Sequence, residues 1–140
     1  MKIFIASDHV GFGMKRYLIE KSEWDLTDLG TDCPESCDYP IFARKLSDCV
    51  LEAGDNCGIL ICSTGIGMSI AANRCVGIRA ALCFNEKMAE FSRRHNDANV
   101  IVFGANVVNY ETAANCLRVF LQTEFEGGRH NRRLKLIDGE

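Results

Sequence analysis

The stretch GILICSTGIG at residues 58–67 decides the fold of this chain. Its first five residues form a continuous apolar run, which is typical of a strand buried on both faces of a parallel sheet. A small, glycine-rich turn follows, and a helix is predicted over about residues 68–74. A strand that leads directly through a turn into a helix is the unit from which parallel α/β sheets are built.

The same alternation recurs on both sides of this unit. Further strands are predicted at residues 2–6, 24–29, 79–83 and 99–103, and helices at about residues 12–22, 42–53, 86–94 and 111–125. With right-handed crossovers, this order predicts a three-layer, Rossmann-like α/β/α domain around a five-stranded parallel sheet. We expect the flavodoxin-like strand order 2-1-3-4-5. The basic segment at 126–140 is expected to be helical and to contribute to the site or to a dimer.

Length and composition indicate one domain over residues 1–140, because 47% of the residues are hydrophobic and 25% are charged. The net charge of −3 gives no cationic field for nucleic acid. No apolar run approaches the ~18 residues of a membrane span, and the N-terminus lacks a signal-peptide pattern. We therefore expect a cytoplasmic protein without nucleic-acid or membrane partners.

The chain has eight cysteines but no C-x-x-C motif, so we expect neither a structural metal nor a disulfide framework. Most of these residues should be reduced, buried and hydrophobic in character. Cys62 differs because it precedes the N-terminus of a predicted helix, where the thiolate form is favoured. It is a candidate nucleophile or general base, and an ordinary core cysteine is the alternative.

Topology places a site at the carboxyl ends of the first and third strands, where doubly wound sheets bind ligands. The turn after Cys62 exposes backbone N–H groups at a helix N-terminus, which suits a phosphate or an oxyanion. A tight turn without any ligand is the alternative. The first strand ends at Asp8 and His9, a pair that can transfer protons or bind phosphate, or that simply caps the surface.

Two further polar segments lie late in the chain. The first, RRHNDAN at residues 93–99, taken alone is a loop between a helix and a strand. The second, GGRHNRR at residues 127–133, places Arg129 and Arg133 on one helical face, where they could clamp one phosphate. A solvated basic tail is the alternative.

These segments together resemble the B-type ribose-5-phosphate isomerases and the wider group that includes the galactose-6-phosphate isomerase subunits. The matching stretches are SDHVGF at 7–12, DYP at 38–40, GILICSTGIGMSIAANR at 58–74, GIRA at 77–80, RHNDANV at 94–100 and EGGRH at 126–130. The resemblance implies a homodimer, or a tetramer of such dimers, that needs no metal or cofactor. Its implied reaction is the interconversion of D-ribose 5-phosphate and D-ribulose 5-phosphate through an enediolate, a step of the non-oxidative pentose phosphate pathway.

The resemblance also implies roles by position. Cys62 matches the base that moves a proton between C2 and C1, Thr64 matches the residue that shuttles protons between O1 and O2, and His95 with Asp8 matches the ring-opening groups. The implied substrate-binding residues are His9, Arg129 and Arg133 for the phosphate, Tyr39 and Asn96 for the sugar, and Ser63, Gly65 and Gly67 in the turn that stabilises the enediolate.

His95 precedes the fifth strand and should therefore lie near the opposite edge of the sheet from Asp8 and Cys62. We accordingly expect His95 and Asn96 to enter a shared active site from a partner subunit.

Two residues depart from the family pattern. Ser63 stands where many members have glycine, and Asn106 stands where many carry a phosphate-binding arginine. These departures bear on the preferred sugar more than on the reaction type, so allose 6-phosphate and galactose 6-phosphate stay open as substrates. A non-catalytic module that binds a phosphosugar is the alternative from another functional class.

Overall fold

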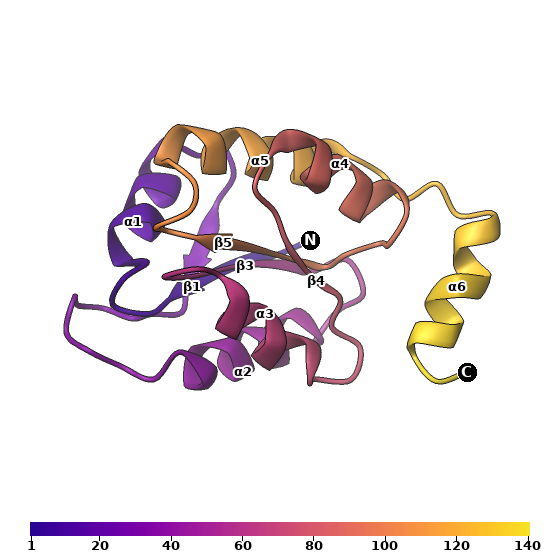
Figure 1. Ribbon diagram of the computed structural model, residues 1–140, viewed down its shortest axis with the longest axis horizontal. Helices are drawn as coiled ribbons and strands as arrows, with labels where there is room; N and C mark the ends of the chain where they lie inside the picture. The colour runs from indigo at the N-terminus through magenta and orange to yellow at the C-terminus, as the bar shows by residue number, and fades with distance from the viewer.

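The computed structural model describes residues 1–140 and contains a five-stranded parallel sheet between two layers of helices (Figure 1). The strands are β1 (Ile3–Ser7), β2 (Leu26–Asp28), β3 (Cys57–Cys62), β4 (Ala80–Leu82) and β5 (Val100–Gly104). The helices are α1 (Phe12–Lys21), α2 (Tyr39–Val50), α3 (Ile66–Asn73), α4 (Glu86–Arg94), α5 (Tyr110–Gln122) and α6 (Arg129–Ile137). The predicted α/β class with a five-stranded parallel sheet is confirmed.

The expected strand order 2-1-3-4-5 is wrong in its last two positions, because the sheet runs β2-β1-β3-β5-β4. All five residues of β5 are buried, which requires a neighbouring strand on each side. The three residues of β4 are only half-buried, which suits the edge of the sheet. β5 therefore pairs with β3 and places Gly104 directly opposite Cys62.

Alternate residues of each central strand enter two separate cores. Ile5 and Ile59 pack on the side of α1, α4 and α5, whereas Leu60 and Val102 pack on the side of α2 and α3. Burying one such aliphatic side chain stabilises a fold by roughly 1.5–3 kcal/mol. Cys62 belongs to the second core, so its side chain lies on the α2 and α3 side of the sheet.

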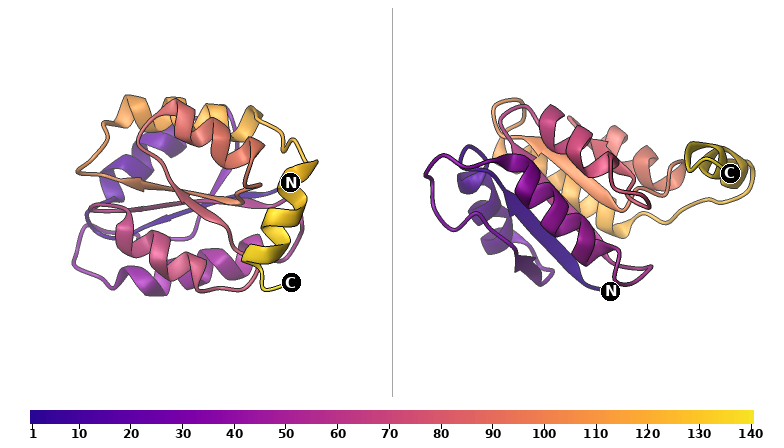
Figure 2. Two further views of the ribbon diagram at one scale, coloured as in Figure 1. Left: turned by 45° about the vertical axis from the view of Figure 1, so that its right-hand side comes forward. Right: turned by 90° about the horizontal axis from the view of Figure 1, so that it is seen from below.

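Helix α6 stands apart from both layers and projects beyond the end of the sheet where the strands begin (Figures 1 and 2). It buries only His130 and Leu134 against the rest of the chain. Leu136 and Ile137 are 60% and 65% exposed, which is high for large aliphatic residues. No helix of the chain combines the length and apolar character needed to cross a lipid bilayer.

Candidate active site

The centre of the candidate site is the segment from Cys62 to Gly67, named here the anion loop. Cys62 ends β3 and is 5% exposed. Gly65 has a φ of 82°, and a Cβ there would lie 2.5 Å from Leu82 Cδ1, so only glycine fits this turn into α3. The first N–H groups of α3 have no acceptor within the helix, so the positive end of its dipole lies just beyond the Cys62 residue.

The segment after β5 holds the anion loop in place. The N–H groups of Ala105 and Asn106 donate to the carbonyl oxygens of Cys62 and Ser63, at 2.8 and 2.9 Å. The Asn106 side-chain amide also donates to Ser63 Oγ, at 2.8 Å. Ser63 and Asn106, the two residues that depart from the family pattern, are therefore direct hydrogen-bond partners. The sequence did not predict this contact, because the expected strand order kept β5 away from β3.

Thr64 lies at the exposed mouth of the anion loop. Its hydroxyl oxygen accepts a hydrogen bond from the Ile66 N–H at 3.3 Å, at the entrance to α3. Gly104 makes this placement possible, since a Cβ at that position would come within 2.4 Å of the Thr64 carbonyl oxygen. The Thr64 hydroxyl therefore stands on the open side of the loop, where a ligand can reach it.

Asp8 and His9 follow the carboxyl end of β1, next to the end of β3. The Asp8 N–H donates to the Ile61 carbonyl at 3.1 Å, and its carboxylate accepts from the Gly11 N–H at 2.9 Å. His9 Nδ1 accepts from the Cys37 N–H at 3.3 Å. In the neutral ring this leaves the proton on Nε2, so His9 can donate a hydrogen bond to an anion.

Tyr39 completes this group from the start of α2. A Cβ on Gly67 would lie 2.6 Å from Tyr39 Cζ, so the ring lies against the backbone of the anion loop. The structure thus gathers eight of the expected site residues near the carboxyl ends of the strands, which we call the carboxyl edge of the sheet. They are Asp8, His9, Tyr39, Cys62, Ser63, Thr64, Gly65 and Gly67.

The other four expected residues lie elsewhere. Because β4 and β5 are parallel, α4 must carry the chain back to the side where the strands begin, and it ends there at Arg94 with His95 as its C-cap. Asn96 follows, and Arg129 and Arg133 are exposed on α6, whose His130 stacks on the His95 ring. One chain therefore holds two separate groups of site residues, at opposite edges of its sheet.

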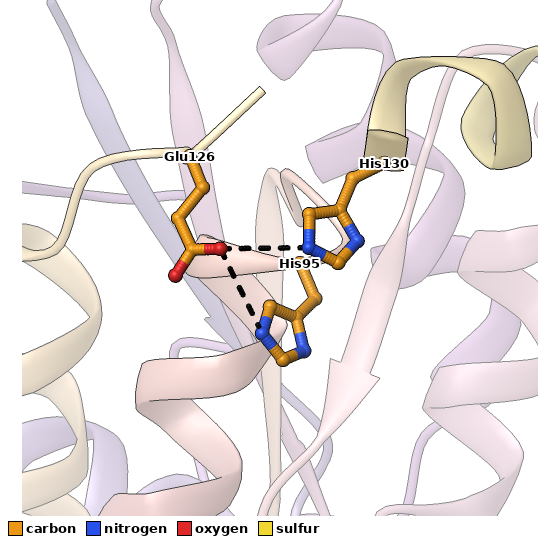
Figure 3. Close-up of side chains that lie close together, drawn as sticks. All are labelled: His95, Glu126 and His130. Carbon is orange, nitrogen blue, oxygen red and sulfur yellow. Dashed lines mark ion pairs between the residues drawn. The ribbon is translucent and has the colours of Figure 1, made fainter. Parts of the chain in front are cut away.

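The second group includes a cluster that sequence reasoning missed, formed by His95, Glu126 and His130 (Figure 3). One oxygen of Glu126, Oε2, lies 3.5 Å from His130 Nε2 and 3.9 Å from His95 Nε2. Glu126 lies before the start of α6, so helical spacing does not predict its contact with His130. Nothing local connects either residue to His95, which lies in a distant segment.

The charges of this cluster follow from its neighbours. Hydrogen bonds from Arg94 lower the pKa of Glu126, which keeps it a carboxylate. Burial, followed by the nearby Arg129, lowers the pKa of His130 and favours its neutral form. The cluster therefore combines a fixed negative charge with a neutral imidazole beside His95.

These three side chains are also the best candidates for holding a metal, since their possible ligand atoms lie within 4.8 Å of one another. The two imidazole planes, however, are stacked with an angle of 17° between them. Their in-plane lone pairs run side by side and do not converge on one ion. The eight cysteines are free thiols. The geometry suits proton handling better than metal binding.

Comparison with known proteins gives one consistent result. The model of the Ribose/Galactose Isomerase family matches residues 3–137. Ribose-5-phosphate isomerase B of Escherichia coli is 42% identical, with 97% of this chain and 93% of that protein covered. A relative from Rickettsia bellii is 48% identical, covers 97% of this chain and 96% of its own length, and has a name that goes no further than sugar phosphate isomerase.

Solved structures agree with these matches. Ribose-5-phosphate isomerase B of Clostridium thermocellum superposes with a TM-score of 0.94 at 44% identity, covering 99% of this chain and 96% of that one. The enzyme of Mycoplasma genitalium, solved with bound ribulose 5-phosphate, gives a TM-score of 0.93 at 38% identity, covering 99% and 94%. The family resemblance seen in the sequence is confirmed.

Proposed function

Because the chain belongs to the ribose/galactose isomerase family of sugar phosphate isomerases, we propose that it interconverts D-ribose 5-phosphate and D-ribulose 5-phosphate. The observation that carries this proposal is the position of Cys62 at the end of β3, followed directly by the anion loop and the N-terminus of α3. A base and an oxyanion site are thereby adjacent, which is what an enediolate mechanism requires.

Catalysis begins with opening of the furanose ring. One group removes the proton from the C1 hydroxyl while another protonates the ring oxygen O4, so that the C1–O4 bond breaks and the C1 aldehyde forms. Asp8 and His95 divide these two roles. His9, Arg129 and Arg133 bind the phosphate, which does not react and so supplies binding energy for orientation. Tyr39 and Asn96 line the pocket that holds the sugar.

Isomerisation then proceeds on the open-chain aldehyde. The Cys62 thiolate takes the C2 proton, the electron pair forms the C1=C2 bond, and O1 becomes an oxyanion stabilised by N–H groups of the anion loop. Thr64 passes the O2 proton to O1. The Cys62 thiol returns its proton to C1 as the ketone forms at C2. No metal or redox cofactor enters this sequence, because the electrons move only within the substrate.

The active site is shared in a homodimer. His95, Asn96 and the α6 arginines lie at the opposite sheet edge from Cys62, so a partner subunit supplies them to each anion loop. Large apolar side chains are exposed on α3 and in the segments that follow α3, β4 and β5, and we expect a partner subunit to cover them. They include Ile66, Ile70, Val76, Phe84 and Val107, at exposed fractions from 45% to 94%.

A substrate panel tests the proposal. Purified protein is incubated separately with ribose 5-phosphate, allose 6-phosphate and galactose 6-phosphate, and the ketose product is measured. We expect the highest kcat/KM for ribose 5-phosphate. Turnover of a six-carbon sugar alone would reassign the substrate to that class. Saturable binding of all three sugars without any ketose would instead support the phosphosugar-binding module.

A further inference from the structure

The His95 ring contacts two aromatic rings and has a carboxylate near one edge. Phe91 packs against it with ring centroids 4.7 Å apart, and His130 stacks on it at 4.4 Å with a 17° interplanar angle. The Glu126 carboxylate faces its Nε2 edge, at 3.9 Å (Figure 3). A histidine with no function in a loop does not require these contacts. They restrict the orientation of the His95 ring, which suggests that this orientation is important for function.

The carboxylate is itself fixed in place. Arg94 contacts Glu126 Oε1 through two guanidinium nitrogens and is also paired with Glu90. The Glu126 N–H donates to the Arg94 carbonyl at 3.1 Å, which ties this segment to the end of α4. The second oxygen, Oε2, is left for the two imidazoles. His130 Nε2 is buried and makes no hydrogen bond.

We propose that Glu126 and His130 are positioning residues for His95: Glu126 fixes which ring nitrogen holds the proton, and His130 fixes the ring plane. The proposal rests on the proposed function, in which His95 takes part in ring opening. A contraction of about 1 Å converts the Glu126–His95 contact into a charge-assisted hydrogen bond, and such bonds are often long before substrate binds.

This arrangement explains how His95 could exchange a proton with the sugar. With Nε2–H directed at Glu126, the opposite nitrogen Nδ1 is the one that faces substrate. When Nδ1 carries a proton, the ring is an imidazolium, and the Glu126 carboxylate stabilises that charge. Arg94, Arg129 and Arg133 oppose it from α4 and α6. Since the neutral form of His130 is favoured, this ring stacks on His95 without adding positive charge.

The test exploits a chemical difference between the two sugars. Ribose 5-phosphate is a closed furanose, whereas ribulose 5-phosphate stays open because its C5 hydroxyl carries the phosphate. Exchange of the C1 hydrogen of ribulose 5-phosphate with D2O requires the Cys62 base but no ring opening. Comparing aldose turnover with this exchange separates ring chemistry from proton transfer at carbon.

For Glu126→Gln we expect kcat with ribose 5-phosphate to fall about tenfold or more, with KM and the D2O exchange rate of ribulose 5-phosphate each changed less than about threefold. Glu126→Asp should recover part of the loss. The control is Glu124→Gln, which removes a carboxylate from an exposed neighbouring residue without a side-chain partner.

His130 is tested with a matched pair. His130→Phe keeps the stacked ring and should retain most aldose turnover, whereas His130→Ala should lose it. Unchanged kcat in Glu126→Gln, or equal loss of aldose turnover and D2O exchange, would overturn the positioning role. If wild-type protein turns over neither sugar, the proposed function fails and this proposal fails with it. A wild type that is active beside an unaffected Glu126→Gln variant leaves the function standing and rejects only the positioning role.

Discussion

At the scale of single residues, position determines which of the eight thiols can do chemistry. Burial raises the pKa of Cys57 to about 11 and of Cys83 to about 12, so these two are un-ionised core residues at neutral pH. Cys62 is also buried, yet it ends the strand that leads through the anion loop to the N-terminus of α3. Residue type alone would not have separated these cysteines, whereas the turn that follows Cys62 does.

Replacement of Cys62 by alanine should remove nearly all turnover of ribose 5-phosphate and leave its binding largely intact. The variant lacks the base but keeps the phosphate contacts and the loop N–H groups. Cys62→Ser should also be poor, because a hydroxyl ionises far less than a thiol near neutral pH. Steady-state kinetics and a binding titration measure the two effects separately.

Cys83→Ala serves as the control for thiol loss. It should keep kcat within about twofold and cost about 1–3 kcal/mol of unfolding free energy, since it empties a buried position. Iodoacetamide should inactivate the wild type through one thiol that ribose 5-phosphate protects. Retention of wild-type kcat by Cys62→Ala would transfer the role of base to a carboxylate or histidine of the site.

The Ser63–Asn106 hydrogen bond gives a second prediction at this scale. If Asn106 braces the anion loop through Ser63 Oγ, Ser63→Ala and Asn106→Ala should each raise KM by a similar, few-fold amount. The double variant should be no worse than either single one, which corresponds to a coupling energy of about 0.5–1.5 kcal/mol. Additive effects on KM in the cycle would mean that the two side chains act independently.

At the scale of elements, the sequence was sufficient to predict the individual helices and strands. Apolar runs such as GILIC and helical periodicity predicted each strand and helix to within about three residues. This is possible because the spacing of apolar residues within a short segment reflects which of its faces is buried. The order of β4 and β5 was predicted wrongly, although the signal was present. VIVFG is a continuous apolar run suited to the centre of a sheet, whereas the segment around β4 includes charged and half-buried residues.

The candidate site divides in the same way. The group of residues at the carboxyl ends of the strands could be predicted, because parallel strands bring these ends together regardless of the loop conformations. The Ser63–Asn106 contact depended on the strand order and was missed. The His95–Glu126–His130 cluster depends on how the segment after α5 returns to α4, which no local pattern specifies. Contacts between loops that are distant in the sequence therefore could not be predicted.

Helix α6 leads to a prediction about phosphate binding. Arg129 and Arg133 are one turn apart and exposed, so both can face the same anion. Arg133→Ala should raise KM for ribose 5-phosphate about tenfold, because a charge-assisted contact contributes roughly 1.5–3 kcal/mol, with a smaller fall in kcat. Lys135→Ala removes a positive charge from the opposite side of the helix and should change KM less than about threefold.

At the scale of the whole molecule, the proposed site residues form two groups, at opposite ends of the strands, that one chain does not bring together. The anion loop leads from the end of β3 into α3, whereas α4 ends at the opposite end of the sheet, on the side from which α6 projects (Figure 1). Helix α6 projects from the body, with Leu136 and Ile137 exposed, and adds little to the fold of its own chain. The proposed two-fold dimer would account for both observations, because the residues near the start of the strands in each subunit would then complete the group near the strand ends of the other.

Mixing two inactive variants tests this arrangement directly. In a hybrid of Cys62→Ala and His95→Ala subunits, one shared site lacks both groups and the other is intact. Random exchange gives about half hybrid dimers, so activity should recover to about a quarter of the wild-type value. Mixing Cys62→Ala with Asp8→Ala is the control, since both residues belong to the same group and every hybrid site stays defective. Recovery in the control, or none in the test pair after proven subunit exchange, would mean that each chain builds its own site.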